Sequence, residues 1–142
     1  MKMHFFKFIC VLGVLSLFIN CTQINKNHKH QIVNTMELNK ILNPVVRQAI
    51  KAWQEGDSEK WLACFTQDPK LLDDGNQRDF INFSTHAIGT ERFTTIDKVE
   101  DDGLSVFGQF HSDTWGDFKT YFKFSIDPEG KIYKLEIGQA HY

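Results

Sequence analysis

The sequence has few cysteines, and their positions exclude a fold held by disulfides. It contains three, at Cys10, Cys21 and Cys64, and the first two fall within the N-terminal 21 residues. An intramolecular disulfide needs two thiols in the same folded part of the chain, so Cys64 has no partner in the remaining sequence. Its neighbours Leu62 and Phe65 are apolar, which predicts a buried, unreactive thiol. A catalytic nucleophile is the alternative.

A hydrophobic run long enough to span a membrane is also missing. Residues 8–19 are almost wholly apolar, but this run is too short for a spanning helix. Two lysines precede it and Cys21 follows it, which resembles a bacterial lipoprotein signal peptide over residues 1–21, with Cys21 as the lipid-bearing residue. Asn20 departs from the small residue usual before that cysteine. An ordinary cleaved signal or an uncleaved anchor is the alternative.

An excess of positive charge is absent, which argues against a nucleic-acid partner. The chain has 16 Lys+Arg and 18 Asp+Glu, and two of the lysines belong to the signal. The remaining 121 residues therefore carry 14 basic and 18 acidic side chains, a formal net charge of −4. Residues 22–35 are polar and are predicted to form a tether, and residues 36–142 are long enough for one domain with its own core.

The motifs of several catalytic and ligand-binding classes are missing as well. No glycine-rich phosphate loop, Gly-x-Ser-x-Gly elbow or zinc-spaced Cys/His cluster occurs in the sequence. His28 and His30 would give a metal only two ligands, so they are interpreted as part of the tether. We therefore expect no metal and no cofactor.

Three helices are predicted in the first half of the domain. Apolar residues recur at intervals of three and four from Leu42 to Trp53, which is typical of an amphipathic helix ending at Gly56. Asn43-Pro44 predicts its start, with Asn43 as the cap and Pro44 at the first helical position. A second helix follows from the Gly56-Asp57 corner and is expected to stop before Asp68-Pro69, where residues 70–73 run extended. A third helix is expected to begin within residues 76–79 and to close at Gly89.

Alternating aromatic and β-branched residues then predict four strands, over residues 93–99, 104–112, 118–126 and 131–137. The intervening turns suit antiparallel hairpins. Helices collected on one face of an antiparallel sheet give an α+β domain. The strand with the clearest alternation directs one set of side chains towards the helices: Phe118, Thr120, Phe122, Phe124 and Ile126.

This order of elements resembles the nuclear transport factor 2-like (NTF2-like) superfamily, which includes ketosteroid isomerases and SnoaL-type polyketide cyclases. The likeness spans roughly residues 41 to 142 and is best in WQEGDSEKWLACFTQDP and in GKIYKLEIG. The resemblance implies a cone-shaped domain, with three N-terminal helices packed in the concave face of a curved antiparallel sheet and a mostly apolar pocket at the open end.

The resemblance also gives positions for a catalytic site. The general-base aspartate of the isomerases falls on Asp73, but their oxyanion-hole tyrosine falls on Ala49 and the assisting aspartic acid on Thr120. Losing one such donor costs about a hundred- to a thousand-fold in rate, so steroid isomerisation is not expected. The Thr120 hydroxyl can still donate one hydrogen bond into the pocket.

Each candidate site residue also has a purely structural interpretation. Asp73 is a general base or an anchoring acceptor, or else a turn carboxylate. His86 is a second candidate base, or else a half-exposed helix histidine. Trp115 covers the pocket mouth or only its own turn. The predicted pocket residues are Trp53, Leu71, Asp73, Phe110, Trp115 and Thr120.

Two functional hypotheses remain. The first is a non-enzymatic lipoprotein of the bacterial envelope that binds a small apolar molecule or acts as an interaction module, with Thr22 favouring the outer membrane. The alternative is a lyase, isomerase or cyclase that uses Asp73 as base. Phe107, His111 and Tyr121 alternate onto the outer face of the sheet, which predicts a homodimer through that face. The final residues, His141 and Tyr142, are expected to fray.

Overall fold

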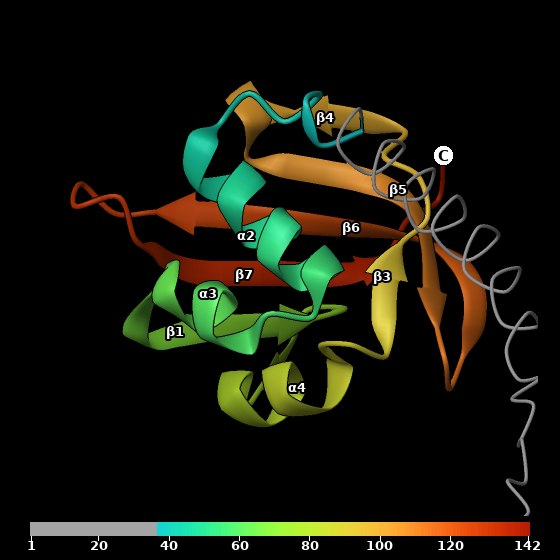
Figure 1. Ribbon diagram of the computed structural model, residues 1–142, viewed down its shortest axis with the longest axis horizontal. Helices are drawn as coiled ribbons and strands as arrows, with labels where there is room; N and C mark the ends of the chain where they lie inside the picture. Colours follow the sequence, from blue (N-terminus) through green and yellow to red (C-terminus); the bar gives the residue numbers. More distant parts are fainter. Residues whose placement is uncertain (1–36) are drawn as a thin grey trace, which may run out of the picture. The chain divides into compact units, whose positions relative to one another are not determined.

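A computed structural model of the chain describes residues 37–142 (Figure 1). The predicted signal peptide, the Cys21 anchor and the predicted tether over residues 22–35 lie outside the described residues. Within residues 37–142, no helix is long and apolar enough to cross a lipid bilayer.

The first long helix, α2 (Pro44–Glu55), has the boundaries that its sequence predicts. The Asn43 side chain accepts hydrogen bonds from the Val45 and Val46 amides at 3.0 and 3.2 Å, so it satisfies two of the free N–H groups at the helix start. Gly56 ends the helix in the left-handed conformation, with φ of 69°. Asp57 then caps α3 (Ser58–Ala63) through the Lys60 amide.

The prediction for the end of the second helix was wrong. The helix stops at Ala63, and strand β1 (Phe65–Asp73) includes the Asp68-Pro69 pair that was expected to end it. The Cys64 carbonyl accepts from the Ile132 amide at 2.9 Å, so pairing with a distant strand draws these residues out of the helix. As a result, Phe65 belongs to strand β1 and its side chain is buried, whereas Leu62 remains exposed on α3.

A short hairpin follows β1 and leads to the last helix. Asp74 and Gly75 have positive φ and turn the chain into β2 (Asn76–Arg78), so residues expected to begin a helix form a strand instead. The helix α4 (Phe80–Ala87) starts four residues later than its earliest predicted position. Its cap is Asp79, whose carboxylate accepts from the Asn82 amide at 2.6 Å.

The remaining strands are β3 (Glu91–Phe93), β4 (Lys98–Glu100), β5 (Ser105–Ser112), β6 (Gly116–Ile126) and β7 (Ile132–Gln139). The sheet order is β2-β1-β7-β6-β5-β3, with β4 also on β5. The antiparallel β5-β6-β7 meander confirms the prediction. The parallel pairing of β1 with β7 was not predicted, because it joins strands that are far apart in the chain.

The strand predicted over residues 93–99 is interrupted. The Thr94 amide bonds to the Gln109 carbonyl and the Asp97 amide to the Phe107 carbonyl, both at 2.8 Å, so two residues bulge out between these bonds. The bulged Thr95 carbonyl passes over Gly108 so closely that a Cβ there would lie 2.0 Å from its oxygen. The absent side chain of Gly108 therefore makes the interruption possible.

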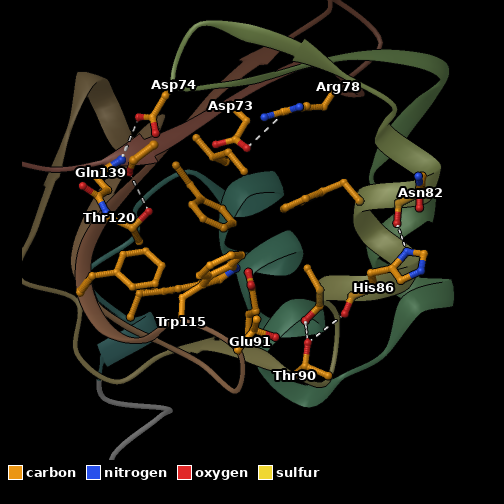
Figure 2. Close-up of a pocket in the computed structure, with 18 of the residues that line it drawn as sticks. Asp73, Asp74, Arg78, Asn82, His86, Thr90, Glu91, Trp115, Thr120 and Gln139 are labelled. Carbon is orange, nitrogen blue, oxygen red and sulfur yellow. Dashed lines mark hydrogen bonds and ion pairs between the residues drawn. The ribbon is translucent and has the colours of Figure 1, made fainter.

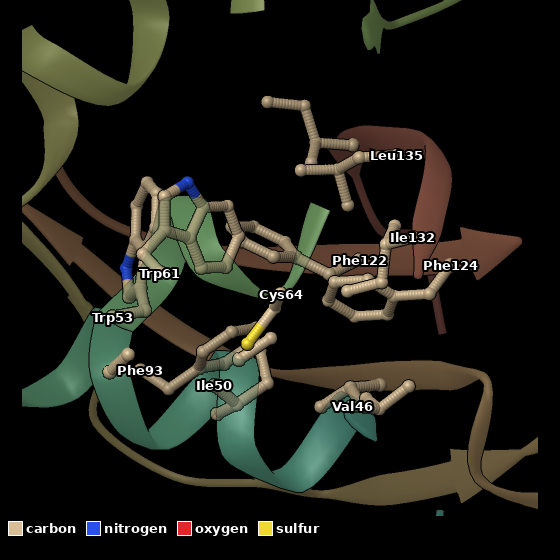
Figure 3. Close-up of a cluster of buried hydrophobic side chains, with 14 of the residues drawn as sticks. Val46, Ile50, Trp53, Trp61, Cys64, Phe93, Phe122, Phe124, Ile132 and Leu135 are labelled. Atoms are coloured by element: carbon tan, nitrogen blue, oxygen red, sulfur yellow. The ribbon is translucent and has the colours of Figure 1, made fainter. Parts of the chain in front are cut away.

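Helices α2 and α3 cover one face of this curved, mostly antiparallel and unclosed sheet, and α4 lies beside its β1 edge (Figure 1). The core between them is aromatic (Figure 3): Trp53 and Trp61 are fully buried with ring centroids 4.9 Å apart. Phe122 packs edge-on against Trp53 at 5.4 Å. The predicted α+β cone, with three helices in the concave face of the sheet, is confirmed.

The end of the chain is docked rather than frayed, contrary to prediction. The Tyr142 hydroxyl donates to the Asp97 carboxylate at 2.6 Å, and Lys119 Nζ donates to the Tyr142 carbonyl at 2.6 Å. Burial and this bond to an anion raise the pKa of Tyr142 to about 12. The ring lies edge-on against Phe107, so Tyr142 covers part of the outer sheet face.

Candidate functional site

The open end of the cone contains a cavity of about 910 Å³, within the size range of small-molecule sites (Figure 2). Helix α4, the β1–β2 hairpin and strands β3, β5, β6 and β7 all contribute to its walls. Its lining residues are Asp73, Asp74, Arg78, Asp79, Asn82, Phe83, His86, Ala87, Thr90, Glu91, Phe110, Thr114, Trp115, Asp117, Phe118, Thr120, Phe122, Ile137, Gly138 and Gln139.

The inner wall of the cavity is apolar. It is formed by Phe83, Phe110, Phe118, Phe122 and Ile137. Trp53 lies behind this wall and does not reach the cavity: its ring centroid is 5.6 Å from that of Phe83 and 6.4 Å from that of Phe110. Leu71 is likewise fully buried and is not among the lining residues. Two of the predicted pocket residues therefore belong to the core and do not line the cavity.

The rim of the cavity is acidic. Five of its lining residues are carboxylates, against one guanidinium, that of Arg78. The mostly apolar pocket implied by the family resemblance is thus corrected: apolar side chains form the inner wall, while charged and polar groups surround the opening. A ligand here meets both environments.

Asp73 lies at the end of β1 and lines the cavity, as the aspartate position of the resemblance implies. Its carboxylate is 3.6 Å from Arg78 Nε, and 38% of its side chain is exposed. The role of turn carboxylate belongs instead to Asp74, which accepts from the Gln139 amide at 3.1 Å. Asp73 is therefore available to a ligand, but water and a cation both screen its charge.

The structure places a second carboxyl group in the cavity, that of Glu91, which the sequence analysis missed. Ser112 Oγ donates to Glu91 Oε1 at 3.0 Å. Burial raises the pKa of Glu91, the Ser112 bond opposes this, and the negative charge of Asp73 raises the pKa further. One signal was present in the sequence: Glu91 lies two residues before Phe93, so in a strand it shares the face of a core residue.

Ser112 also ties Trp115 to this carboxyl group. Its oxygen accepts from the Thr114 and Trp115 amides, both at 3.3 Å, while its hydrogen goes to Glu91. One fully buried hydroxyl thereby fixes the β5–β6 turn beside Glu91. Trp115 lines the cavity although 78% of it is exposed, so an aromatic side chain stands at the opening.

Thr120 lines the cavity but does not offer the hydrogen bond that was expected of it. Its hydroxyl donates to the Gly138 carbonyl at 2.9 Å, so towards a ligand it can only accept. Ala49, the other oxyanion-donor position, is fully buried and is not a lining residue. Neither position supplies a proton donor to the cavity.

His86 lines the cavity from α4. Its Nδ1 lies 2.8 Å from the Asn82 carbonyl oxygen, which can only accept, so Nδ1 carries the hydrogen and Nε2 is the nitrogen available to a ligand. The fold therefore brings Asp73, His86, Phe110, Trp115 and Thr120 to one cavity. Within residues 37–142, no group of three or more His, Cys, Asp or Glu side chains is placed to hold a metal ion.

Comparison with solved structures identifies the fold. The chain has the nuclear transport factor 2-like fold, and its structural neighbours include proteins described as NTF2-like, as candidate ketosteroid isomerases and as candidate polyketide cyclases. At these low identities the likeness shows the fold alone. No protein-family model matches the sequence, and no curated protein matches it.

Three of the similar structures illustrate the range. A candidate ketosteroid isomerase from Kribbella flavida has a TM-score of 0.57 and 11% identity, covering 71% of this chain and 78% of that one. An NTF2-like protein of unknown function from Cytophaga hutchinsonii has a TM-score of 0.55 and 10% identity, covering 68% of this chain and 87% of that one. The Orange Carotenoid Protein of Anabaena, which binds canthaxanthin, has a TM-score of 0.52 and 18% identity. The match covers 67% of this chain but only 35% of that protein.

Proposed function

We propose that this protein binds a small, largely apolar organic molecule in the cavity of its cone without transforming it. The observation that carries the proposal is the cavity of about 910 Å³ with an inner wall of phenylalanines. The absence of a proton donor at Thr120 and Ala49 supports binding over steroid-type isomerisation. The carotenoid protein, a structural neighbour, binds an apolar molecule, which is compatible with this use of the fold.

Binding of the neutral fluorescent probe N-phenyl-1-naphthylamine tests the proposal. We expect its emission to rise on saturable binding to the wild-type domain. Ala87→Leu should reduce this binding because Ala87 lines the cavity, whereas Ala140→Leu, outside the lining, should not. Circular dichroism would establish that both variants are folded. Equal binding to both variants would mean that the probe sits elsewhere, and the proposal would fail.

We further propose that Cys21 carries a lipid and holds the domain at a membrane of the bacterial envelope, the outer membrane being favoured by Thr22. Support comes from the sequence alone, through residues 1–21. Mass spectrometry of the membrane fraction should show a lipid-modified Cys21 as the first residue. Cys21→Ser should move the protein to the soluble fraction, and an unmodified cysteine in a membrane-bound chain would contradict the proposal.

A catalytic function is the second candidate, favoured by one observation: Asp73 and Glu91 share the cavity, and burial, with a smaller contribution from the charge of Asp73, raises the pKa of Glu91. A pair of carboxyl groups with different environments can divide the roles of base and acid. Hydrogen–deuterium exchange at the α-carbon of cyclopentanone, followed by NMR, would test this. Exchange that Asp73→Asn abolishes would favour catalysis over simple binding.

A further inference from the structure

We propose that the ligand of this cavity carries a cationic group, an ammonium or quaternary ammonium, which binds between the Glu91 carboxylate and the Trp115 indole. The apolar part of the same molecule would lie against the phenylalanine wall. The inference rests on the proposed binding function and adds the charge of the ligand to it.

The first observation is that Glu91 faces the cavity without a counter-charge. Its hydrogen-bond donor is the neutral Ser112 hydroxyl, and within residues 37–142 it forms no ion pair. Arg78, the guanidinium of the lining, lies 3.6 Å from Asp73 instead, and Figure 2 shows that pair across the cavity from Glu91. A half-buried carboxylate of this kind attracts a cation more strongly than one in open water.

The second observation is an exposed tryptophan whose backbone is bonded to the hydroxyl that binds this carboxylate. Trp115 and Glu91 are bonded to the same Ser112 oxygen, one through its amide and the other through its carboxylate. The two residues are therefore held as neighbours at the opening. A tryptophan face is the best aromatic partner for a cation, and a carboxylate next to it adds direct Coulomb attraction. An exposed fraction of 78% leaves this indole free to contact a ligand.

The charge of the other lining groups points the same way. Asp74, Asp79 and Asp117 add negative charge around the opening. An anionic ligand would be repelled by them. A neutral apolar ligand that closed the opening would strip water from Glu91 without replacing its favourable interactions. A cation avoids that cost.

Three probes of one shape separate these possibilities: benzyltrimethylammonium, its neutral isostere neopentylbenzene, and benzylsulfonate. Binding to the wild-type domain would be measured by NMR titration of backbone amides. We expect the cation to bind about tenfold or more tightly than the neutral isostere, and the anion to bind most weakly. Added salt should weaken binding of the cation but not of the isostere.

Three variants identify the groups responsible. Glu91→Gln keeps an oxygen for Ser112 and should weaken cation binding several-fold, whereas binding of the isostere should not weaken, because the neutral side chain costs less to desolvate. Trp115→Leu keeps an apolar side chain but removes the aromatic face, so it should also affect the cation more. Glu129→Gln removes an exposed carboxylate of the β6–β7 turn, outside the cavity lining, and should change neither.

The outcomes distinguish the two proposals. If the neutral isostere or the anion binds as tightly as the cation, the cationic ligand is excluded while the apolar binding function stands. Cation binding that is insensitive to both Glu91→Gln and Trp115→Leu would also exclude this site. If none of the three probes binds but N-phenyl-1-naphthylamine does, the cationic ligand is excluded and the apolar binding function stands, whereas failure of all four would overturn both proposals.

Discussion

At the scale of the residue, the two core tryptophans differ in how their indole nitrogens are satisfied. Trp61 Nε1 donates to Ser84 Oγ at 3.0 Å, and both residues are buried. Trp53 Nε1 is equally buried, but no partner for it is present among the described residues. An unsatisfied buried donor is costly, so the Trp61–Ser84 bond matters mainly because breaking it would create a second one.

Ser84→Ala should therefore lower the free energy of unfolding by about 1–3 kcal/mol, because the Trp61 N–H would be left buried without an acceptor. Chemical denaturation would measure the change. Thr85→Ala is the matched control: its hydroxyl bonds to the Ile81 carbonyl on the exposed side of the same helix, and its loss should cost little. Equal costs for the two variants would contradict this interpretation.

Glu91 makes stability depend on pH in a specific direction. Because burial and then the charge of Asp73 raise its pKa in the folded state, opposed by the Ser112 bond, the folded protein binds a proton where the unfolded chain has released one. Stability attributed to this group is full below the ordinary glutamate pKa and declines as pH rises through the raised value.

Glu91→Gln should remove that decline, so the variant should gain stability relative to wild type between those two pH values. Thermal unfolding measured from pH 4 to pH 8 would test it, with Glu129→Gln as control. The comparison is made as a difference between variants, because the Asp73–Arg78 ion pair lines the same cavity and is present in all of them. An unchanged pH profile would contradict the raised pKa.

At the scale of the element, local hydrogen bonds decide where the helices begin. Asn43→Ala removes both side-chain bonds to the first amides of α2 and should cost about 0.5–2 kcal/mol of stability. Urea denaturation would give the difference. Asn39→Ala, at an exposed position outside the helix, should be close to neutral. A neutral Asn43→Ala would show that the cap contributes nothing.

The close crossing at Gly108 predicts a larger effect. Gly108→Ala would place a Cβ 2.0 Å from the Thr95 carbonyl oxygen, so the bulge between β3 and β4 would have to move, at a cost of about 3 kcal/mol or more. Gly130→Ala is the comparison, since Gly130 has a positive φ but open space around it, and strain alone should cost about 1–2 kcal/mol. Denaturation curves showing the reverse order would contradict the bulge.

At the scale of the whole molecule, the docked Tyr142 bears on whether the outer face of the sheet can form a homodimer. The predicted homodimer through Phe107, His111 and Tyr121 stays a prediction, but Tyr142 covers part of Phe107, and Lys98 and Lys123 lie over the rings of that face. Two copies meeting there would bring lysines together. Sedimentation at micromolar concentration, with Tyr142→Ala as the variant that uncovers Phe107, would show whether the face self-associates.

Docking of Tyr142 also predicts alkaline behaviour. Its pKa is raised to about 12, by burial and by its bond to Asp97, so this contribution to stability is full below pH 10 and is lost as pH rises towards 12. Absorbance of tyrosinate should show that the tyrosine with a pKa of about 12 is lost in Tyr142→Phe, while Tyr121, whose pKa is raised by burial and by the charge of Asp74, still titrates above the ordinary tyrosine value. A tyrosine with a pKa of about 12 that persists in Tyr142→Phe would place the effect elsewhere.

The local features of the fold could be predicted from the sequence. Neighbouring residues determine the cap at Asn43, the end of α2 at Gly56, the turns between strands and the alternation that directs Phe122 inward. The structure confirms these predictions. These features depend on interactions between residues a few positions apart, so the residues that cause them are close together in the sequence.

Contacts between distant residues settled the rest. Residues 65–69 lie in a strand because Phe65 and residues 70–73, on either side of them, pair with β7, more than sixty positions later in the chain. The Thr120 hydroxyl is turned to the Gly138 carbonyl of a neighbouring strand, and Glu91 meets Ser112 across another strand pairing. Sequence patterns report which face a side chain occupies, but the partner on that face is chosen by sheet register and curvature, which arise only when the whole chain has folded.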